Sequence, residues 1–179
     1  MIIWVIVLLL TACGSTKVNT AQSRFYQSFV TRFNVYHNGN EAYKEGLSAQ
    51  EKSHKDNYME IIPLFPVSKE NTRSSGSGSF DKAIEKSQKA IKLHSIKQKP
   101  KKKAGRKLSE KDKLWYAKKE YNPYLHNAWM LMGKAQFQKG EFLEAASTFS
   151  YITRLYSEDP KIVAEARMRM AQCYAELEW

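Results

Sequence analysis

Residues 122–156 read NPYLHNAWMLMGKAQFQKGEFLEAASTFSYITRLY and decide the fold class. Trp129, Met132 and Gly133 stand at positions i, i+3 and i+4, which places them on one face of a helix. Gly140 then marks a turn, because glycine adopts backbone conformations that other residues avoid. The stretch therefore predicts two antiparallel helices joined by a short turn.

Side-chain size alternates along this stretch in the pattern of a tetratricopeptide (TPR) repeat. Gly133 and Ala145 carry almost no side chain, so the two helices can approach closely there. An antiparallel helical hairpin of no particular family would need only apolar residues at helical spacing. The alternation of small and large side chains favours the TPR repeat. Its marker residues are Trp129, Met132, Gly133, Gly140, Phe142, Ala145, Phe149 and Ile152.

The start of this stretch recurs later in the chain. Asn122-Pro123 opens the stretch, and Asp159-Pro160 follows 37 residues later. An Asx side chain can accept hydrogen bonds from a first helical turn, and proline at the first helical position gives up no hydrogen bond. The segment after Pro160 then matches the first helix of a further repeat through Ala164, Ala166, Met170, Ala171 and Tyr174, with Ala171 in the place of Gly133.

We therefore expect an all-α protein whose TPR-like helical hairpins form the start of an α-solenoid. Repeats stack to bury their faces and end in a polar cap. No second helix follows the one predicted for residues 160–179, so we expect the chain to be the N-terminal portion of a longer repeat protein.

The net charge of +11 on 179 residues is concentrated in one insert. Between Lys97 and Lys119, eleven lysines and arginines stand against Glu110 and Asp112. Such a run could bind phosphates of a nucleic acid, but no recognition fold accompanies it, and we expect no nucleic-acid partner. We expect residues 97–107 to form a solvated loop; docking to an acidic partner or an anionic lipid is the alternative.

The chain begins with an apolar run, MIIWVIVLLL, that is too short to span a bilayer and suits a secretory signal. Leu10-Thr11-Ala12-Cys13 resembles a bacterial lipobox, which implies lipidation of Cys13 and anchorage in a bilayer. The alternative is a soluble protein with an apolar first strand. No Lys or Arg precedes the run, which suggests an earlier true start. Gly14 resembles an outer-membrane sorting signal.

The next segment predicts a helical hairpin. A helix over residues 20–36 carries an aromatic stripe, which we expect to pack against the rest of the chain. The sequence Asn38-Gly39-Asn40 predicts a break, after which Asn40 caps a second helix over residues 41–55. The stripe consists of Phe25, Phe29 and Phe33 at i, i+4 and i+8.

Residues 59–67 (MEIIPLFPV) are apolar, but two prolines exclude regular structure. We expect an extended strap laid against the helices; the alternative is a recognition segment for a partner. Residues 68–79 contain SSGSGS and predict a flexible loop.

Ser79 is expected to cap a helix over residues 80–97, whose pattern resembles the second helix of a TPR repeat. Whether it completes a degenerate repeat with residues 41–55 stays open. Ser109 with Asp112 predicts a capping box that opens a short helix through Trp115 and Tyr121. The helix predicted over residues 80–97 has one largely apolar face, which consists of Phe80, Ala83, Ile84, Ser87, Ala90 and Ile91.

The expected organisation has six parts: a signal peptide (1–12), a lipidated tether (13–20), a helical hairpin with the strap (21–67), a flexible loop (68–79), a helix with the basic insert and a short helix (80–121), and the TPR repeat with the first helix of the next (122–179).

No enzyme constellation is visible, and we expect neither a metal nor a cofactor. The sequence has no phosphate-binding glycine loop and no nucleophile elbow. Cys173 is expected to be a small core residue rather than a reactive thiol. Four histidines are scattered without metal-ligand spacing, namely His37, His54, His94 and His126.

The order of motifs resembles the PorW/SprE lipoproteins of Bacteroidetes. The resemblance rests on the lipobox followed by Ser23-Arg24-Phe25-Tyr26, Arg32-Phe33-Asn34-Val35-Tyr36, Asn38-Gly39-Asn40-Glu41-Ala42-Tyr43, Ile62-Pro63-Leu64 and Ala128-Trp129-Met130-Leu131-Met132-Gly133-Lys134. It implies a longer TPR lipoprotein on the periplasmic side of the outer membrane that links components of type IX secretion and supports gliding motility. The family offers no catalytic residues.

The leading hypothesis is thus a non-enzymatic, lipid-anchored scaffold for proteins of a secretion complex. A TPR lipoprotein of outer-membrane barrel assembly would share the anchor and the repeats, but not the stretch from Asn38 to Tyr43. A periplasmic protein that binds the cell wall would need clustered carboxylates or an aromatic platform in a cleft, and the sequence indicates neither.

Overall fold

The computed structural model describes residues 18–101 and 108–177, and within these ranges the regular structure is entirely helical. The helices are α2 (Ala21–Val30), α3 (His37–Ser53), α4 (Glu70–Ser74), α5 (Ser77–His94), α6 (Glu110–Ala117), α7 (Leu125–Gln138), α8 (Phe142–Leu155) and α9 (Pro160–Glu176). A π-helical turn, η1 (Thr31–Tyr36), joins α2 to α3, and a 3-10 turn, η2 (Pro66–Ser68), precedes α4.

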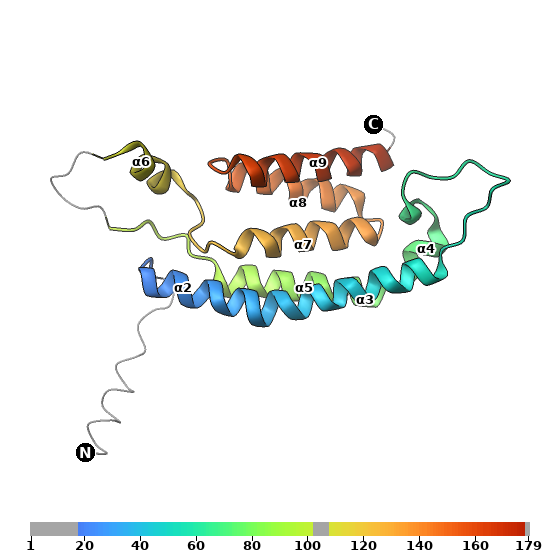
Figure 1. Ribbon diagram of the computed structural model, residues 1–179, viewed down its shortest axis with the longest axis horizontal. Coiled ribbons are helices and arrows are strands. Elements are labelled where there is room, and N and C mark those ends of the chain that lie inside the picture. The colour runs from blue at the N-terminus through green and yellow to red at the C-terminus, as the bar shows by residue number, and fades with distance from the viewer. Residues whose placement is uncertain (1–17, 102–107, 178–179) are drawn as a thin grey trace, which may run out of the picture.

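The long helices pack side by side in chain order. α3 packs on α5, α5 on α7, α7 on α8 and α8 on α9, so α2 and α3 form one edge of the stack and α9 the other (Figure 1). Neighbours run antiparallel. The predicted all-α class is confirmed.

Both halves of the stack use the same close contact between a glycine and a phenylalanine ring. A Cβ atom added at Gly133 of α7 would lie 2.7 Å from the ring of Phe149 on α8. A Cβ atom added at Gly46 of α3 would lie 2.7 Å from the ring of Phe80 on α5. Both rings are fully buried, so only glycine lets these helix pairs reach this separation.

The predicted break at Asn38-Gly39-Asn40 is wrong. The chain stays helical from Ala21 to Ser53, and Gly39 lies inside α3. A Cβ atom at Gly39 would lie 3.1 Å from Cβ of Lys86 and 3.3 Å from Cδ2 of Leu131. Gly39 therefore permits close helix packing and does not form a turn, so the predicted hairpin is one continuous helical run.

The predicted packing of the aromatic stripe is also wrong. Phe25, Phe29 and Phe33 are 73%, 52% and 58% exposed. Four successive buried positions of the same run are spaced four residues apart, and the first two are polar. The four are Gln27, Thr31, Val35 and Gly39.

A four-residue period drifts around an α-helix by about 40° per step, because one turn holds about 3.6 residues. The η1 turn has wider i→i+5 hydrogen bonding and holds more residues per turn. It therefore offsets the drift and keeps this row of buried residues facing the rest of the stack.

The Ser/Gly segment is ordered, contrary to the predicted flexible loop. Residues 68–79 form the end of η2, all of α4 and the first turn of α5, and Thr72 is buried. Arg73 donates from Nε to the carbonyl of Val67 (2.8 Å) and from Nη2 to that of Ser68 (3.1 Å). Gly76, at φ +79°, caps α5 where the backbone of Gly46 leaves no room for a side chain.

The predicted strap divides into two parts. Phe65 packs edge-on against Phe137 at 5.3 Å, and Val67 is buried, as expected of a strap. The preceding residues 58–64 do not lie against the helices, because most of their large side chains are strongly exposed. These are Tyr58, Met59, Ile61, Ile62 and Leu64.

The predicted helix starts have mixed outcomes. The capping box at Ser109 is confirmed, since its hydroxyl accepts from the Asp112 N–H at 3.2 Å and the Asp112 carboxylate accepts from the Ser109 N–H. Asp159 caps α9, also as predicted. Helix α6 ends at Ala117, however, so the predicted extension to Tyr121 is wrong.

Candidate protein-binding surfaces

Most of the predicted repeat markers form the core between α7 and α8. Met132, Phe142, Ala145, Phe149 and Ile152 are all buried. Trp129 is half-buried, with its ring 4.8 Å from that of Tyr151. Gly140, at φ +81°, forms the predicted turn. These residues hold the hairpin together.

The two predicted markers on α9 lie elsewhere. Ala171 and Tyr174 are exposed, while Ala166 and Cys173 are the fully buried residues of this helix. Burial raises the pKa of the Cys173 thiol to about 11, so it stays protonated at neutral pH, and the prediction of a small core residue is confirmed. The predicted lipidation site, Cys13, lies outside the described residues.

A buried carboxylate fastens the end of the stack. Oε1 of Glu120 accepts from the backbone N–H groups of Ile96 (2.8 Å), Tyr121 (3.0 Å) and Asn122 (2.8 Å). Its Oε2 accepts from the hydroxyl of Ser95. Four donors thus satisfy a charge that would otherwise be costly to bury. The role of Glu120 is to join the end of α5 to the segment before α7.

Asn122 connects the same segment to the first helix. Its Nδ2 donates to Oγ1 of Thr31 (3.0 Å) and to the carbonyl of His94 (2.9 Å). The predicted role of Asn122-Pro123 as the start of a helix is wrong, because α7 begins at Leu125. Asn122 is instead buried, and its amide makes the connections that a surface cap could not make.

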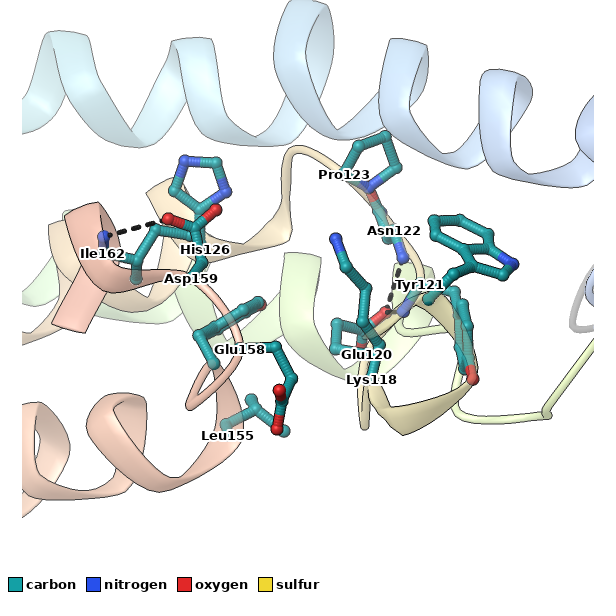
Figure 2. Close-up of a pocket in the computed structure, with 12 residues that line it drawn as sticks. Lys118, Glu120, Tyr121, Asn122, Pro123, His126, Leu155, Glu158, Asp159 and Ile162 are labelled. Carbon is teal, nitrogen blue, oxygen red and sulfur yellow. Dashed lines mark hydrogen bonds between the residues drawn. The ribbon is translucent and has the colours of Figure 1, made fainter. Parts of the chain in front are cut away.

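A cavity of about 250 Å³ lies between the segment before α7 and the turn between α8 and α9 (Figure 2). Figure 2 shows Lys118, Glu120 and Asn122 on one wall and Leu155, Glu158 and Ile162 on the other. The cavity is smaller than the roughly 300–1,000 Å³ of typical small-molecule sites.

Burial shifts two titratable groups of the cavity lining toward their neutral forms. Burial lowers the pKa of His126 and raises that of Tyr156, whose buried hydroxyl has no hydrogen-bond partner among the described residues. Glu120 is occupied by its four donors.

Two surfaces face outward with unusual composition. One is the apolar loop of residues 58–64, and the other is the aromatic face of α2 and η1. Large exposed apolar patches mark interaction sites in soluble proteins. The stripe was visible in the sequence, but its exposure was not, because the apolar period of a helix normally indicates its buried side.

Comparisons with known proteins leave the family open: no family model matches the chain, and no curated protein matches it significantly. Within residues 18–101 and 108–177, no group of three or more His, Cys, Asp or Glu side chains could hold a metal ion. No helix in these ranges has both the length and the apolar character needed to cross a membrane.

Proposed function

We propose that this chain is a non-enzymatic scaffold whose helical hairpins are TPR-type repeats that bind other proteins. On this proposal it is a lipoprotein of the PorW/SprE type, anchored through Cys13 to the periplasmic side of the outer membrane. Its repeats hold together components of the type IX secretion machinery, on which gliding motility depends.

The observation that carries the scaffold proposal is the repetition of one packing unit. In each of the pairs α3–α5 and α7–α8, a Cβ atom added at a helix glycine would lie 2.7 Å from a buried phenylalanine ring, and the two pairs stack directly through α5 and α7. Stacked hairpins of this kind build extended surfaces for protein partners rather than enclosed active sites.

The family-specific part of the proposal rests on the sequence motifs. Those at positions 23–26 and 32–43 lie on the run from α2 to α3, and the motif at 128–134 lies on α7. Gly133 has a contact that only glycine permits, and Gly39 lies at a close approach of its helix to α5 and α7, which supports a shared architecture.

Capture from native membranes tests the partner class. The full chain with a tag after Trp179 is recovered with mild detergent, and the proteins that accompany it are identified by mass spectrometry. Periplasmic-ring and translocon proteins of type IX secretion are expected. Recovery of barrel-assembly proteins without secretion proteins would overturn the proposal.

A pair of variants focuses this test on the exposed loop. Met59→Ser combined with Ile61→Ser removes two side chains that are more than 90% exposed, so folding is expected to be unaffected. Loss of the secretion proteins would place their contact on this loop. Leu143→Ser on α8, where the side chain is 60% exposed, is the matched control and should retain them.

The anchor has a separate test. Cells that express the chain are labelled with a radioactive or clickable fatty acid, and the Cys13→Ser variant is labelled in parallel. Label on the parent chain and none on the variant is the expected result. Equal labelling of both would show that the acyl chain is not attached at Cys13.

A further inference from the structure

The first helical run is amphipathic in the opposite sense from an ordinary surface helix. Its inner face presents Gln27 and Thr31 to the rest of the protein, and both are buried. Its outer face presents three phenylalanines to solvent. A helix that buries polar groups and exposes rings indicates that the rings have a function outside the fold.

The exposed rings form one continuous strip. The centroids of Phe25 and Phe29 are 6.2 Å apart, and those of Phe29 and Phe33 are 4.9 Å apart. Tyr26 lies beside them and is 55% exposed. At 1.5 Å per residue, the eight helical steps from Phe25 to Phe33 span about 12 Å. We call Phe25, Tyr26, Phe29 and Phe33 the aromatic face.

The charged side chains of the segment that carries the aromatic face have one sign. Residues 18–40 contain no Asp or Glu, and the first acidic residue of the chain is Glu41. Arg32 is exposed, with its guanidinium 5.0 Å from the ring centroid of Phe33. Arg24 lies 5.0 Å from the ring centroid of Trp115 on α6. The segment of residues 18–40 therefore combines exposed aromatic rings with arginines and contains no acidic residue.

We propose that the aromatic face binds the surface of an anionic lipid bilayer, with α2 lying in the plane of the interface. Aromatic rings partition into the boundary between headgroups and acyl chains, and flanking arginines are attracted to anionic headgroups. The bilayer is thus complementary to both the rings and the charge.

The size of the face favours a lipid surface over a protein. Four half-exposed aromatic side chains offer about 500 Å² of accessible surface. A stable protein interface buries about 800 Å² on each partner. Small aromatic wedges are enough for reversible insertion between lipids, especially when a second membrane signal is present.

The position of the face suits a flat surface. α2 lies at the edge of the stack opposite α9, so a bilayer could contact it without meeting α8 or α9 (Figure 1). Seven residues, 14–20, lie between Cys13 and the start of α2, and they can span at most about 25 Å when extended. This last point alone rests on the proposed lipid anchor; the exposure and the charge of the face do not.

The first experiment reads lipid contact at one position. The full chain with Cys13→Ser, which cannot be acylated, receives either Phe29→Trp or Leu143→Trp. Any attachment through residues 1–10 is the same in both variants. Each variant is mixed with vesicles of phosphatidylglycerol and phosphatidylcholine whose acyl chains are either brominated or plain. The fluorescence of the Cys13→Ser chain without the added tryptophan is subtracted, because the chain has four tryptophans of its own.

We expect brominated lipid to reduce the added fluorescence of the Phe29→Trp variant to about half and to leave that of the Leu143→Trp variant unchanged. Adding Arg32→Gln should weaken docking of the Phe29→Trp variant about fivefold, and phosphatidylcholine alone should give much less quenching.

No quenching in the Phe29→Trp variant, or equal quenching in both variants, would overturn the inference. If Cys13 is acylated in cells while the indole at position 29 is not quenched, the anchor stands and this inference fails by itself.

The second experiment separates a bilayer from a protein partner in cells. Phe29 is replaced by the photo-crosslinking residue benzoylphenylalanine in the full chain, and the envelope is irradiated. A mass increase equal to a phospholipid supports the bilayer. A crosslink to a protein, or no crosslink beyond that of the same photo-crosslinker at position 143, would overturn it.

Discussion

Gly46 offers the sharpest test of the packing unit, because the sequence around it gives no sign of a repeat. A Cβ atom there would lie 2.7 Å from two ring atoms of Phe80 and 3.0 Å from a third. Carbon atoms in contact prefer separations of about 3.5–4.0 Å. The ring cannot move aside easily, since Phe80 is fully buried and packs on Tyr43 with centroids 5.7 Å apart.

Overpacking of a core costs about 1–3 kcal/mol, and so severe a contact belongs at the upper end. Replacing glycine by alanine inside a helix returns about 1 kcal/mol. We therefore expect Gly46→Ala to lower the free energy of unfolding by about 2 kcal/mol. For a chain of this size, that corresponds to a fall in melting temperature of about 4–8 °C.

Gly78→Ala is the matched control, because a Cβ atom at Gly78 meets nothing within 4 Å among the described residues. It lies in the first turn of α5 and should leave stability unchanged or raise it by up to about 1 kcal/mol. Both variants are measured by thermal and denaturant unfolding followed by circular dichroism.

A double variant checks the mechanism. Phe80→Leu shortens the opposing side chain, so Gly46→Ala should cost about 1 kcal/mol less in that background than in the parent. A Gly46→Ala protein that melts at or above the parent would refute the proposed packing unit in the first half of the chain.

Three further predictions concern buried groups. Glu120→Gln turns an amide NH₂ toward backbone donors, so it should lower the free energy of unfolding by about 2 kcal/mol; denaturant unfolding no different from the parent would contradict the hydrogen-bond network. Burial lowers the pKa of His94, so the unfolded state binds its proton more readily, and stability should fall as pH drops below about 6.5. His94→Gln should flatten that decline in unfolding curves measured across this range, and an unchanged slope would argue against it. In the Cys13→Ser chain, the buried thiol of Cys173, with its pKa raised to about 11, should react with a disulfide reagent slowly when folded and rapidly in denaturant. Fast reaction of the folded chain would show that α9 does not cover this thiol.

Local chemistry allowed several elements to be predicted from sequence. The hairpin of α7 and α8 follows from its apolar period and from the glycine turn, and both are local properties. The caps at Ser109 and Asp159 follow from side chains that bond to backbone groups two or three residues away. The buried face of α5 likewise follows from its own periodicity.

The candidate surfaces could not be predicted in the same way. Phe80, the partner of Gly46, is 34 residues away in sequence, so no local pattern indicates that the two residues are in contact. The end cavity brings Lys118 and Glu158 together from two separate turns. Contacts of this kind depend on how helices stack, which local periodicity does not encode.

The sequence by itself determined the helical class, the central hairpin and the helix caps, because these depend on neighbours along the chain. Only the tertiary structure decided that Gly39 continues a helix and that Phe25, Phe29 and Phe33 face outward. The physical reason is that the end of α5 and the segment before α7 offer polar partners to the inner face, such as the Asn122 amide that donates to Thr31. Once hydrogen bonds satisfy the polar face inside, the aromatic face is left for the surroundings.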